Sequence, residues 1–360
     1  MGRALRVGVV GGGIAGLYTS YLLALKGFKV VLYEALPYIG RLHCTGIVSI
    51  DTMRRIEAAE HVEHYYDRLL VSYRGLRVLF YSRSSFACRI DRVGHERSLA
   101  EQLLGLGAKL YTSTRVVGVK TSSAGGQPLV ISSRGRLVVD YALIADGSLG
   151  AISKSLGFNP AKQLLYGYQL LLSSDKRLPE EYQGMMIVVY DFDERGGFLW
   201  IAPVSGRSLL VGYASTQRFN DLLLLSVRNI IKDVMGVSTK PYKFFGGVLV
   251  RGYPRQLVLH RKILCVGDAN SMTKAISCGG LYHISLAGRG VVEYLCLNSM
   301  KTLSSVKRSV KNGYLLYNAL KMLTRARMLM RVKPVLHVKI GPREYDEHPK
   351  ILLNLLRRGV

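Results

Sequence analysis

Acidic residues are scarce in this chain. Its 360 residues include 24 Asp plus Glu against 50 Lys plus Arg, so the formal net charge is +26. A field of this sign favours an anionic partner: nucleic acid, an acidic lipid headgroup, a diphosphate substrate or an acidic protein. The total does not rank these partners. No acidic residue lies between Glu293 and Glu344, so the excess is concentrated near the C-terminus.

Cysteines are few, odd in number and widely spaced, with no CxxC pair: Cys44, Cys88, Cys265, Cys278 and Cys296. This spacing argues against a zinc site and against a secreted disulfide framework. The chain also lacks a clean apolar run of membrane-spanning length. The stretch 7–25 is free of charge, but five glycines interrupt it, which argues against a membrane span or signal peptide. About half the residues are apolar, which excludes a fibrous or fully disordered chain.

The opening alternates strand and helix signals. Apolar periodicity predicts a strand at 5–10, a glycine turn, a helix at 14–26 and a second strand at 28–33. These elements form a βαβ unit. A helix is also predicted at 53–68, and a later apolar strand at 262–266.

The patterns change along the chain in a way that predicts its organisation. Between 161 and 250, β-branched and aromatic runs predict a largely antiparallel, β-rich substrate domain. We therefore expect an α/β protein whose Rossmann-like cofactor domain is discontinuous, built from 1–160 plus 251–300. The segment 301–360 is basic and predicted to be mostly helical.

A GxGxxG motif follows the first predicted strand. Gly11 permits a tight turn, Gly13 lets the backbone approach a pyrophosphate, and Gly16 lets helix and strand pack closely. Glu34 closes the second strand, where an acidic side chain accepts hydrogen bonds from ribose hydroxyls. The order strand, turn, helix and acid predicts a dinucleotide site, with a glycine turn kept for packing as the alternative.

Nicotinamide and flavin enzymes share this opening, so the choice depends on later segments. Ala145, Asp146 and Gly147 end an apolar strand, and the sequence CVGDAN at 265–270 places Asp268 where it can hold the ribityl or phosphate region of a flavin. Together these segments favour FAD and a fold of the glutathione-reductase type.

The chain resembles the geranylgeranyl reductase family of FAD-dependent oxidoreductases, in particular the archaeal branch that acts on isoprenoid lipids. The resemblance covers about residues 5 to 295. It is carried by the Rossmann motif, by IGRLHCTGIVS at 39–49, by Arg92, by GFLWIAP at 197–203, and by the later glycine turns. Trp200, the single tryptophan, lies in the fourth of these segments.

The resemblance implies roles for individual residues. Phe198, Trp200 and Pro203 are expected to bind substrate, and Cys44 is expected to donate a proton or control access to the flavin. The alternatives are core packing for Trp200 and a small buried side chain for Cys44. The residues expected to bind FAD are Gly11, Gly13, Ala15, Gly16, Glu34, Cys44, Thr45, Arg92, Val116, Asp146, Gly147, Gly267, Asp268, Gly279, Gly280 and Leu281.

Several positions depart from the family pattern. Lys274 and Cys278 lie in a turn where the family has Asp-Pro and a run of glycines, Phe198 replaces a tyrosine, and Val204 replaces a lysine. These departures leave open whether substrate and electron donor are the same as the family's. No metal site is expected.

The resemblance implies hydride transfer from reduced FAD to a double bond of a geranylgeranyl lipid or its diphosphate, with reduced nicotinamide or ferredoxin as electron donor. A monooxygenase of the same fold and a non-catalytic, electron-carrying flavoprotein are the alternatives. The basic C-terminal segment predicts either contact with an anionic membrane surface or a solvated helical face. Nucleic acid is disfavoured because no binding module accompanies the charge. We expect a cytoplasmic protein, peripheral on the inner face of the cell membrane.

Overall fold

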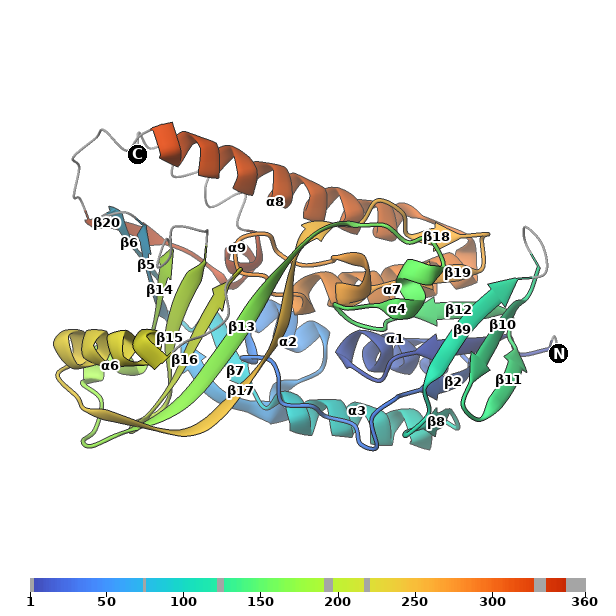
Figure 1. Cartoon of the computed structure of the whole chain (residues 1–360), viewed down its shortest axis with the longest axis horizontal. Helices are drawn as coiled ribbons and strands as arrows, with labels where there is room; N and C mark the ends of the chain where they lie inside the picture. The colour runs from blue at the N-terminus through green and yellow to red at the C-terminus, as the bar shows by residue number, and fades with distance from the viewer. Residues whose placement is uncertain are drawn as a thin grey trace. The chain divides into compact units, whose positions relative to one another are not determined.

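The computed structural model describes residues 3–73, 76–121, 126–190, 197–216, 221–326 and 335–347 (Figure 1). The chain divides into two compact units. Unit 1 comprises Met1–Arg41, Arg92–Gln163 and Val250–Leu320, and unit 2 comprises Leu42–Asp91, Leu164–Leu249 and Lys321–Val360. Both units are therefore assembled from separated segments.

A six-stranded sheet forms the centre of unit 1. Its order is β18-β19-β12-β1-β2-β8, and the pairings are parallel except between β18 and β19. Parallel strands are typically covered on both faces, and their sequences here are nearly continuous runs of apolar residues. The strands are β1 (Arg6–Val10), β2 (Lys29–Tyr33), β8 (Lys109–Tyr111), β12 (Tyr141–Ile144), β18 (Val258–Leu259) and β19 (Ile263–Cys265).

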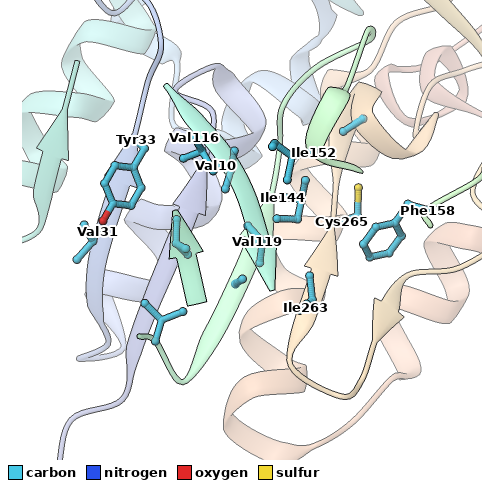
Figure 2. Close-up of a cluster of buried hydrophobic side chains, with 14 residues drawn as sticks. Val10, Val31, Tyr33, Val116, Val119, Ile144, Ile152, Phe158, Ile263 and Cys265 are labelled. Carbon is cyan, nitrogen blue, oxygen red and sulfur yellow. The ribbon is translucent and has the colours of Figure 1, made fainter. Parts of the chain in front are cut away.

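The core of unit 1 gathers side chains from several of these strands. Figure 2 shows Val10, Ile144 and Cys265 in one buried cluster with Phe158. A small sheet, β11-β10-β9, adds Val119 and Val130 to the same cluster. Its strands are β9 (Val116–Thr121), β10 (Pro128–Ser132) and β11 (Gly135–Val138).

Helices pack closely on one another in unit 1. Helix α1 contacts both α3 and α7, and an added Cβ at Gly288 of α7 would lie 3.1 Å from the ring of Tyr18 in α1. Leu303, Val306 and Val310 bury one face of α8. The helices are α1 (Ile14–Leu25), α3 (Arg92–Gly105), α4 (Ala151–Ser155), η2 (Gly267–Asn270), α7 (Leu281–Leu297) and α8 (Lys301–Ala326), the last of which continues into unit 2.

Unit 2 is built on an eight-stranded sheet of order β17-β13-β16-β15-β14-β5-β6-β20. One face packs against α6 through Leu199, Ile201 and Val211. Its strands are β5 (Arg68–Tyr73), β6 (Leu76–Tyr81), β13 (Ala161–Ser174), β14 (Met185–Tyr190), β15 (Phe198–Ser205), β16 (Ser208–Ser215), β17 (Thr239–Tyr253) and β20 (Val335–Lys339). A three-stranded sheet and short helices complete the unit: β3 (Ile47–Ser49), β4 (Val62–Tyr66), β7 (Ala87–Ile90), α2 (Ile50–Arg55), η1 (Ala59–His61), α5 (Glu180–Gln183), α6 (Asp221–Met235) and α9 (Pro342–Asp346).

The predicted α/β fold is confirmed, but individual elements differ. The helix predicted at 53–68 ends at Arg55, and 62–66 form β4, which pairs with β7. Residues 42–91 were assigned to the first domain, yet they group with unit 2 because β5 pairs with β14 of its large sheet. The segment 301–360 contains β20 as well as helix. Among the described residues, no helix has the length and apolar character needed to cross a membrane.

Candidate functional site

The three motif glycines in the turn between β1 and α1 differ in their surroundings. Gly11 has a φ of 105°, and an added Cβ would lie 2.3 Å from the carbonyl oxygen of Ala145. At Gly16 an added Cβ would lie 1.9 Å from the carbonyl oxygen of Gly11. At Gly13 it would meet nothing within 4 Å. Gly11 and Gly16 are therefore required by backbone packing, whereas Gly13 leaves open space at the start of α1.

Glu34 lies at the end of β2, beside this turn. Its Oε2 accepts a hydrogen bond from the backbone N–H of Gly12 at 2.6 Å, and its Oε1 accepts one from that of Leu36 at 2.8 Å. A carboxylate has about four lone-pair directions, so each oxygen keeps capacity for a further donor. The two backbone bonds fix the carboxylate beside the glycine turn, at the position predicted to accept hydrogen bonds from ribose hydroxyls.

Asp146 follows β12 at the same edge of the sheet. Its Oδ2 accepts hydrogen bonds from the N–H groups of Ile152 (2.8 Å) and Ser153 (3.1 Å), which lie in the first turn of α4. Its Oδ1 is buried without a partner in the described structure. The next residue, Gly147, has a φ of 79° and open space at its Cβ position. A buried acceptor beside open backbone is suited to a donor from a bound group.

The turn after β19 packs on the glycine turn, although more than 250 residues separate them. An added Cβ at Gly267 would lie 2.7 Å from the Cβ of Ala15. Asn270 fixes this turn by donating to the carbonyl oxygens of Gln256 (2.7 Å) and Cys265 (3.0 Å). The carboxyl ends of β1, β12 and β19 thus meet where the order of a doubly wound sheet reverses, which is the place where such folds bind nucleotides.

The start of α7 belongs to the same group of segments. Gly280 is its N-cap and supplies no side-chain cap, and Leu281 is buried as the first helical residue. An added Cβ at Gly280 would lie 3.2 Å from Oδ1 of Asp268, whereas Gly279 borders on Lys274. The first N–H groups of a helix without a side-chain cap favour anionic or acceptor atoms.

Cys278 is buried in the loop before α7, with a φ of 57°. Burial raises the pKa of its thiol, and the nearby Arg251 guanidinium acts in the opposite direction without reversing the shift. The thiol is therefore protonated at neutral pH. Cys278, which departs from the family pattern, is therefore a buried and unreactive side chain.

Lys162 was missed by the sequence reasoning and lies in this region too. Its Nζ donates to the carbonyl oxygen of Ser148. Burial lowers its pKa, while the charges of Asp268 and Asp146 raise it. A cation beside these two carboxylates offsets their charge at an edge predicted to bind phosphates. A lone lysine in a polar stretch gave no signal of this.

Four of the residues predicted to bind FAD lie outside the turns described above. Arg92 is buried in α3 and forms an ion pair with Glu96, and Val116 belongs to the hydrophobic core. Cys44 and Thr45 belong to unit 2, whereas the other residues predicted to bind FAD belong to unit 1. Contact of these four side chains with the cofactor stays a prediction.

The unit 1 residues fit FAD. Open space at Gly13, the fixed carboxylate of Glu34, the partnerless Oδ1 of Asp146 and the uncapped starts of α1 and α7 converge on one edge of the sheet. These are the features that a dinucleotide needs: room for the pyrophosphate, an acceptor for ribose, and backbone donors.

The predicted substrate residues lie on β15 of unit 2. The rings of Phe198 and Trp200 have centroids 5.3 Å apart, and Tyr190 extends the group at 5.5 Å from Phe198. Trp200 lies flat over Gly212 of β16, where an added Cβ would be 1.9 Å from the indole Cε2. The sequence did not predict this dependence on Gly212.

Pro203 does not join the aromatic pair. It is paired with Leu209, which belongs to the cluster against α6, and its carbonyl oxygen accepts the hydroxyl of Tyr66 at 2.8 Å. Alternation along β15 directs Phe198 and Trp200 to the opposite face.

Residues 42–45, the Cys44 segment, lie on the face of the sheet that carries Trp200. Leu42 packs in one cluster with Trp200 and Leu171. The hydroxyl of Thr45 donates to Oε1 of Gln169 at 2.8 Å. Gln169 was also missed, although a polar residue in the apolar strand sequence YGYQLLL was a visible signal.

Comparisons with known proteins agree with this architecture. Residues 9–69 match the family model described as NAD(P)-binding Rossmann-like domain. A segment of 55 residues is 44% identical to the NADP(+)-dependent formate dehydrogenase subunit beta of Moorella thermoacetica, covering 15% of this chain and only 8% of that protein. The family match covers the glycine turn and Glu34.

Solved structures match over nearly the whole chain. A geranylgeranyl bacteriochlorophyll reductase-like protein from Thermoplasma acidophilum has a TM-score of 0.76 at 15% identity, with 99% of each chain covered. The myxobacterial chondrochloren halogenase CndH, of the FAD-dependent halogenases, has a TM-score of 0.69 at 16% identity, covering 100% of this chain and 91% of that one. The fold is that of the FAD-dependent oxidoreductases.

This fold is shared by more than one chemistry. A tetrameric 2-methyl-3-hydroxypyridine-5-carboxylic acid oxygenase has a TM-score of 0.65 at 16% identity, with 92% of this chain and 95% of that one covered. The expected resemblance to a geranylgeranyl reductase and to FAD-dependent oxidoreductases is confirmed at the level of the fold. The reaction has to be argued from the residues.

Proposed function

We propose that this protein is an FAD-dependent reductase that saturates double bonds in geranylgeranyl lipid chains. The observation that carries the proposal is the unit 2 sheet face on which the Phe198–Trp200 pair and the Cys44 segment lie together. An apolar aromatic wall on the face that also carries the residues on either side of Cys44 suits an alkene chain that needs alignment and a proton. The full-length fold match to a reductase-like protein is consistent with this reaction.

The roles of the residues follow from their chemistry. The glycine turn and Glu34 bind the dinucleotide, and FAD, when bound and reduced, supplies the hydride for one alkene carbon. Phe198 and Trp200 hold the apolar chain and exclude water. Cys44 Sγ gives its proton to the other carbon and recovers one from solvent. The two electrons consumed per double bond would come from one reduced nicotinamide or from two reduced ferredoxins.

The assay uses purified protein, chemically reduced without oxygen and mixed with a geranylgeranylated lipid. We expect flavin absorbance to return as the lipid gains two hydrogens per double bond, measured by mass spectrometry. A reaction without lipid is the control. Flavin reoxidation with no change in lipid mass would contradict the proposal.

A monooxygenase is the second candidate, because an oxygenase shares the fold over 92% of this chain. Oxygen separates the two reactions. A reductase forms product without oxygen, whereas a monooxygenase needs it and adds an oxygen atom to the substrate. An electron-carrying flavoprotein would change the lipid under neither condition.

We further propose that α8 binds an anionic membrane surface, bringing the enzyme to its lipid. The buried face of α8 leaves Lys301, Arg308 and Lys311 exposed. Leu297, the last residue of α7, and Leu315 of α8 are 74% and 53% exposed, which offers apolar contact as well as charge. Arg327, Arg331 and Lys333 belong to the same basic stretch but lie outside the described residues.

Charge reversal tests this surface. The double substitution Arg308→Glu and Lys311→Glu is expected to weaken binding to phosphatidylglycerol vesicles by at least about thirtyfold, since losing two basic residues at about 1 kcal/mol each removes about 2 kcal/mol and the two new carboxylates are also repelled by the anionic surface. Vesicle sedimentation gives the measurement, with neutral phosphatidylcholine vesicles as the baseline. Lys29→Glu with Lys109→Glu, at exposed positions on β2 and β8, is the matched control. Equal loss in both double variants would mean that net charge alone is responsible.

A further inference from the structure

Gln169 is a buried polar residue in an apolar strand. It lies in β13 with 4% of its surface exposed, and the three residues that follow it, Leu170, Leu171 and Leu172, are all buried. Burying an amide without hydrogen bonds is unfavourable, so such a residue is tolerated only with partners. Nothing in the strand itself requires a polar side chain here.

Both ends of the Gln169 amide are used, and they are used on one short segment. Its Oε1 accepts the hydroxyl of Thr45 at 2.8 Å, and its Nε2 donates to the carbonyl oxygen of His43 at 3.3 Å. A carbonyl oxygen accepts and never donates, which fixes the amide nitrogen toward His43 and its oxygen toward Thr45. The side chain therefore holds the residues on either side of Cys44.

The sheet register places Gln169 on the face of the unit 2 sheet that carries Trp200. Gln169 of β13 is paired with Gly212 of β16, which is paired in turn with Trp200 of β15. Directly paired residues point to the same face of a sheet. Leu42 packs in the cluster that contains Trp200, so the chain before Cys44 is fixed to that face as well.

We propose that Gln169 is a positioning residue that holds the Cys44 thiol on the Trp200 face of the unit 2 sheet. The proposal rests on the proposed function in treating Cys44 as the proton donor. A thiol donates a proton productively only at a fixed place relative to the alkene, because proton transfer requires hydrogen-bond reach. With His43, Thr45 and Leu42 all held, little backbone freedom is left at Cys44.

The test measures the alkylation rate of Cys44 by iodoacetamide, with no lipid present. Cys296 is exposed and the other three cysteines are buried, so a Cys296→Ser background leaves Cys44, which is half-buried, as the reactive thiol. Gln169→Met keeps the side-chain volume and removes both hydrogen bonds. We expect alkylation about tenfold faster, corresponding to about 1.4 kcal/mol for opening the segment. Turnover is expected to fall while flavin content and melting temperature stay unchanged.

Variants at Thr45 make the test specific. Thr45→Val removes the hydroxyl that donates to Gln169 and should also accelerate alkylation, whereas Thr45→Ser keeps it and should restore the original rate. The Thr45→Val and Gln169→Met double variant should react no faster than Gln169→Met alone, because both remove one coupled interaction. Ser173→Ala, at an exposed position of the same strand, should change nothing.

The outcomes separate this proposal from the proposed function. Unchanged alkylation in folded Gln169→Met and Thr45→Val would overturn the positioning role, whatever the lipid assay gives. If Gln169→Met does not fold, Thr45→Val alone decides the question. Faster alkylation in the variants, together with failure of the unsubstituted protein to reduce lipid, would preserve the positioning role of Gln169 and overturn the reductase.

Discussion

Gly13→Ala is expected to give a folded protein that no longer retains FAD. An added Cβ at this position meets no protein atom within 4 Å, so the turn itself accommodates alanine. The methyl group would occupy the space through which the backbone approaches a pyrophosphate. We expect flavin content after purification, measured by visible absorbance, to fall at least about tenfold, with an unchanged melting temperature.

Two other glycines serve as matched controls. Gly105, at the end of α3, also has open space at its Cβ position, so Gly105→Ala should keep both fold and flavin. Gly16→Ala places a methyl group 1.9 Å from the carbonyl oxygen of Gly11. It should destabilise unit 1 by about 3 kcal/mol, at the upper end of typical overpacking costs. Full flavin content in Gly13→Ala would overturn the dinucleotide site.

The βαβ opening could be predicted because its determinants are local. The expected strand at 5–10 and helix at 14–26 correspond to Arg6–Val10 and Ile14–Leu25. Each glycine of the motif acts within a few residues or at the adjoining sheet edge, so spacing alone revealed their positions.

Elements that depend on distant pairing could not be predicted in this way. Apolar residues at 53–68 also fit a helical period, but Glu57 has a φ of 58°, which ends the helix, and the chain then pairs with β7. The parallel pairing of β5 with β14 joins residues more than 100 positions apart and moves 42–91 into unit 2. Tertiary context decided these elements over local propensity.

The candidate site shows the same division between features set by local sequence and features set by distant strand pairing. Motifs predict roles for Cys44, Phe198 and Trp200, but they do not predict the residues that hold these side chains. Gln169 and Gly212 belong to neighbouring strands, and only the register reveals that one fixes the thiol segment and the other lies beneath the indole ring. A glycine within a strand indicates that another group approaches the backbone closely, but the sequence does not show which group.

Gly212→Ala is therefore expected to displace Trp200. The new Cβ would lie 1.9 Å from Cε2 and 2.0 Å from Cζ2 of the indole, and the ring has to move because the β16 backbone is held by strands on both sides. Trp200 is the chain's single tryptophan, so intrinsic fluorescence of the flavin-free protein reports its displacement directly. We expect a red-shifted emission, a loss of about 1–3 kcal/mol of stability, and strongly reduced lipid turnover.

The controls for this prediction separate the ring contact from the general effect of alanine in a strand. Gly118→Ala in β9, where an added Cβ lies 4.0 Å from the nearest side chain, should be nearly neutral. Trp200→Leu combined with Gly212→Ala should recover much of the stability lost in Gly212→Ala, because the smaller side chain leaves room for the methyl group and the two substitutions are coupled. The double variant should still lack turnover if the indole is the substrate wall. Unchanged emission and turnover in Gly212→Ala would remove Trp200 from the substrate face, while full turnover in the double variant would assign it to core packing alone.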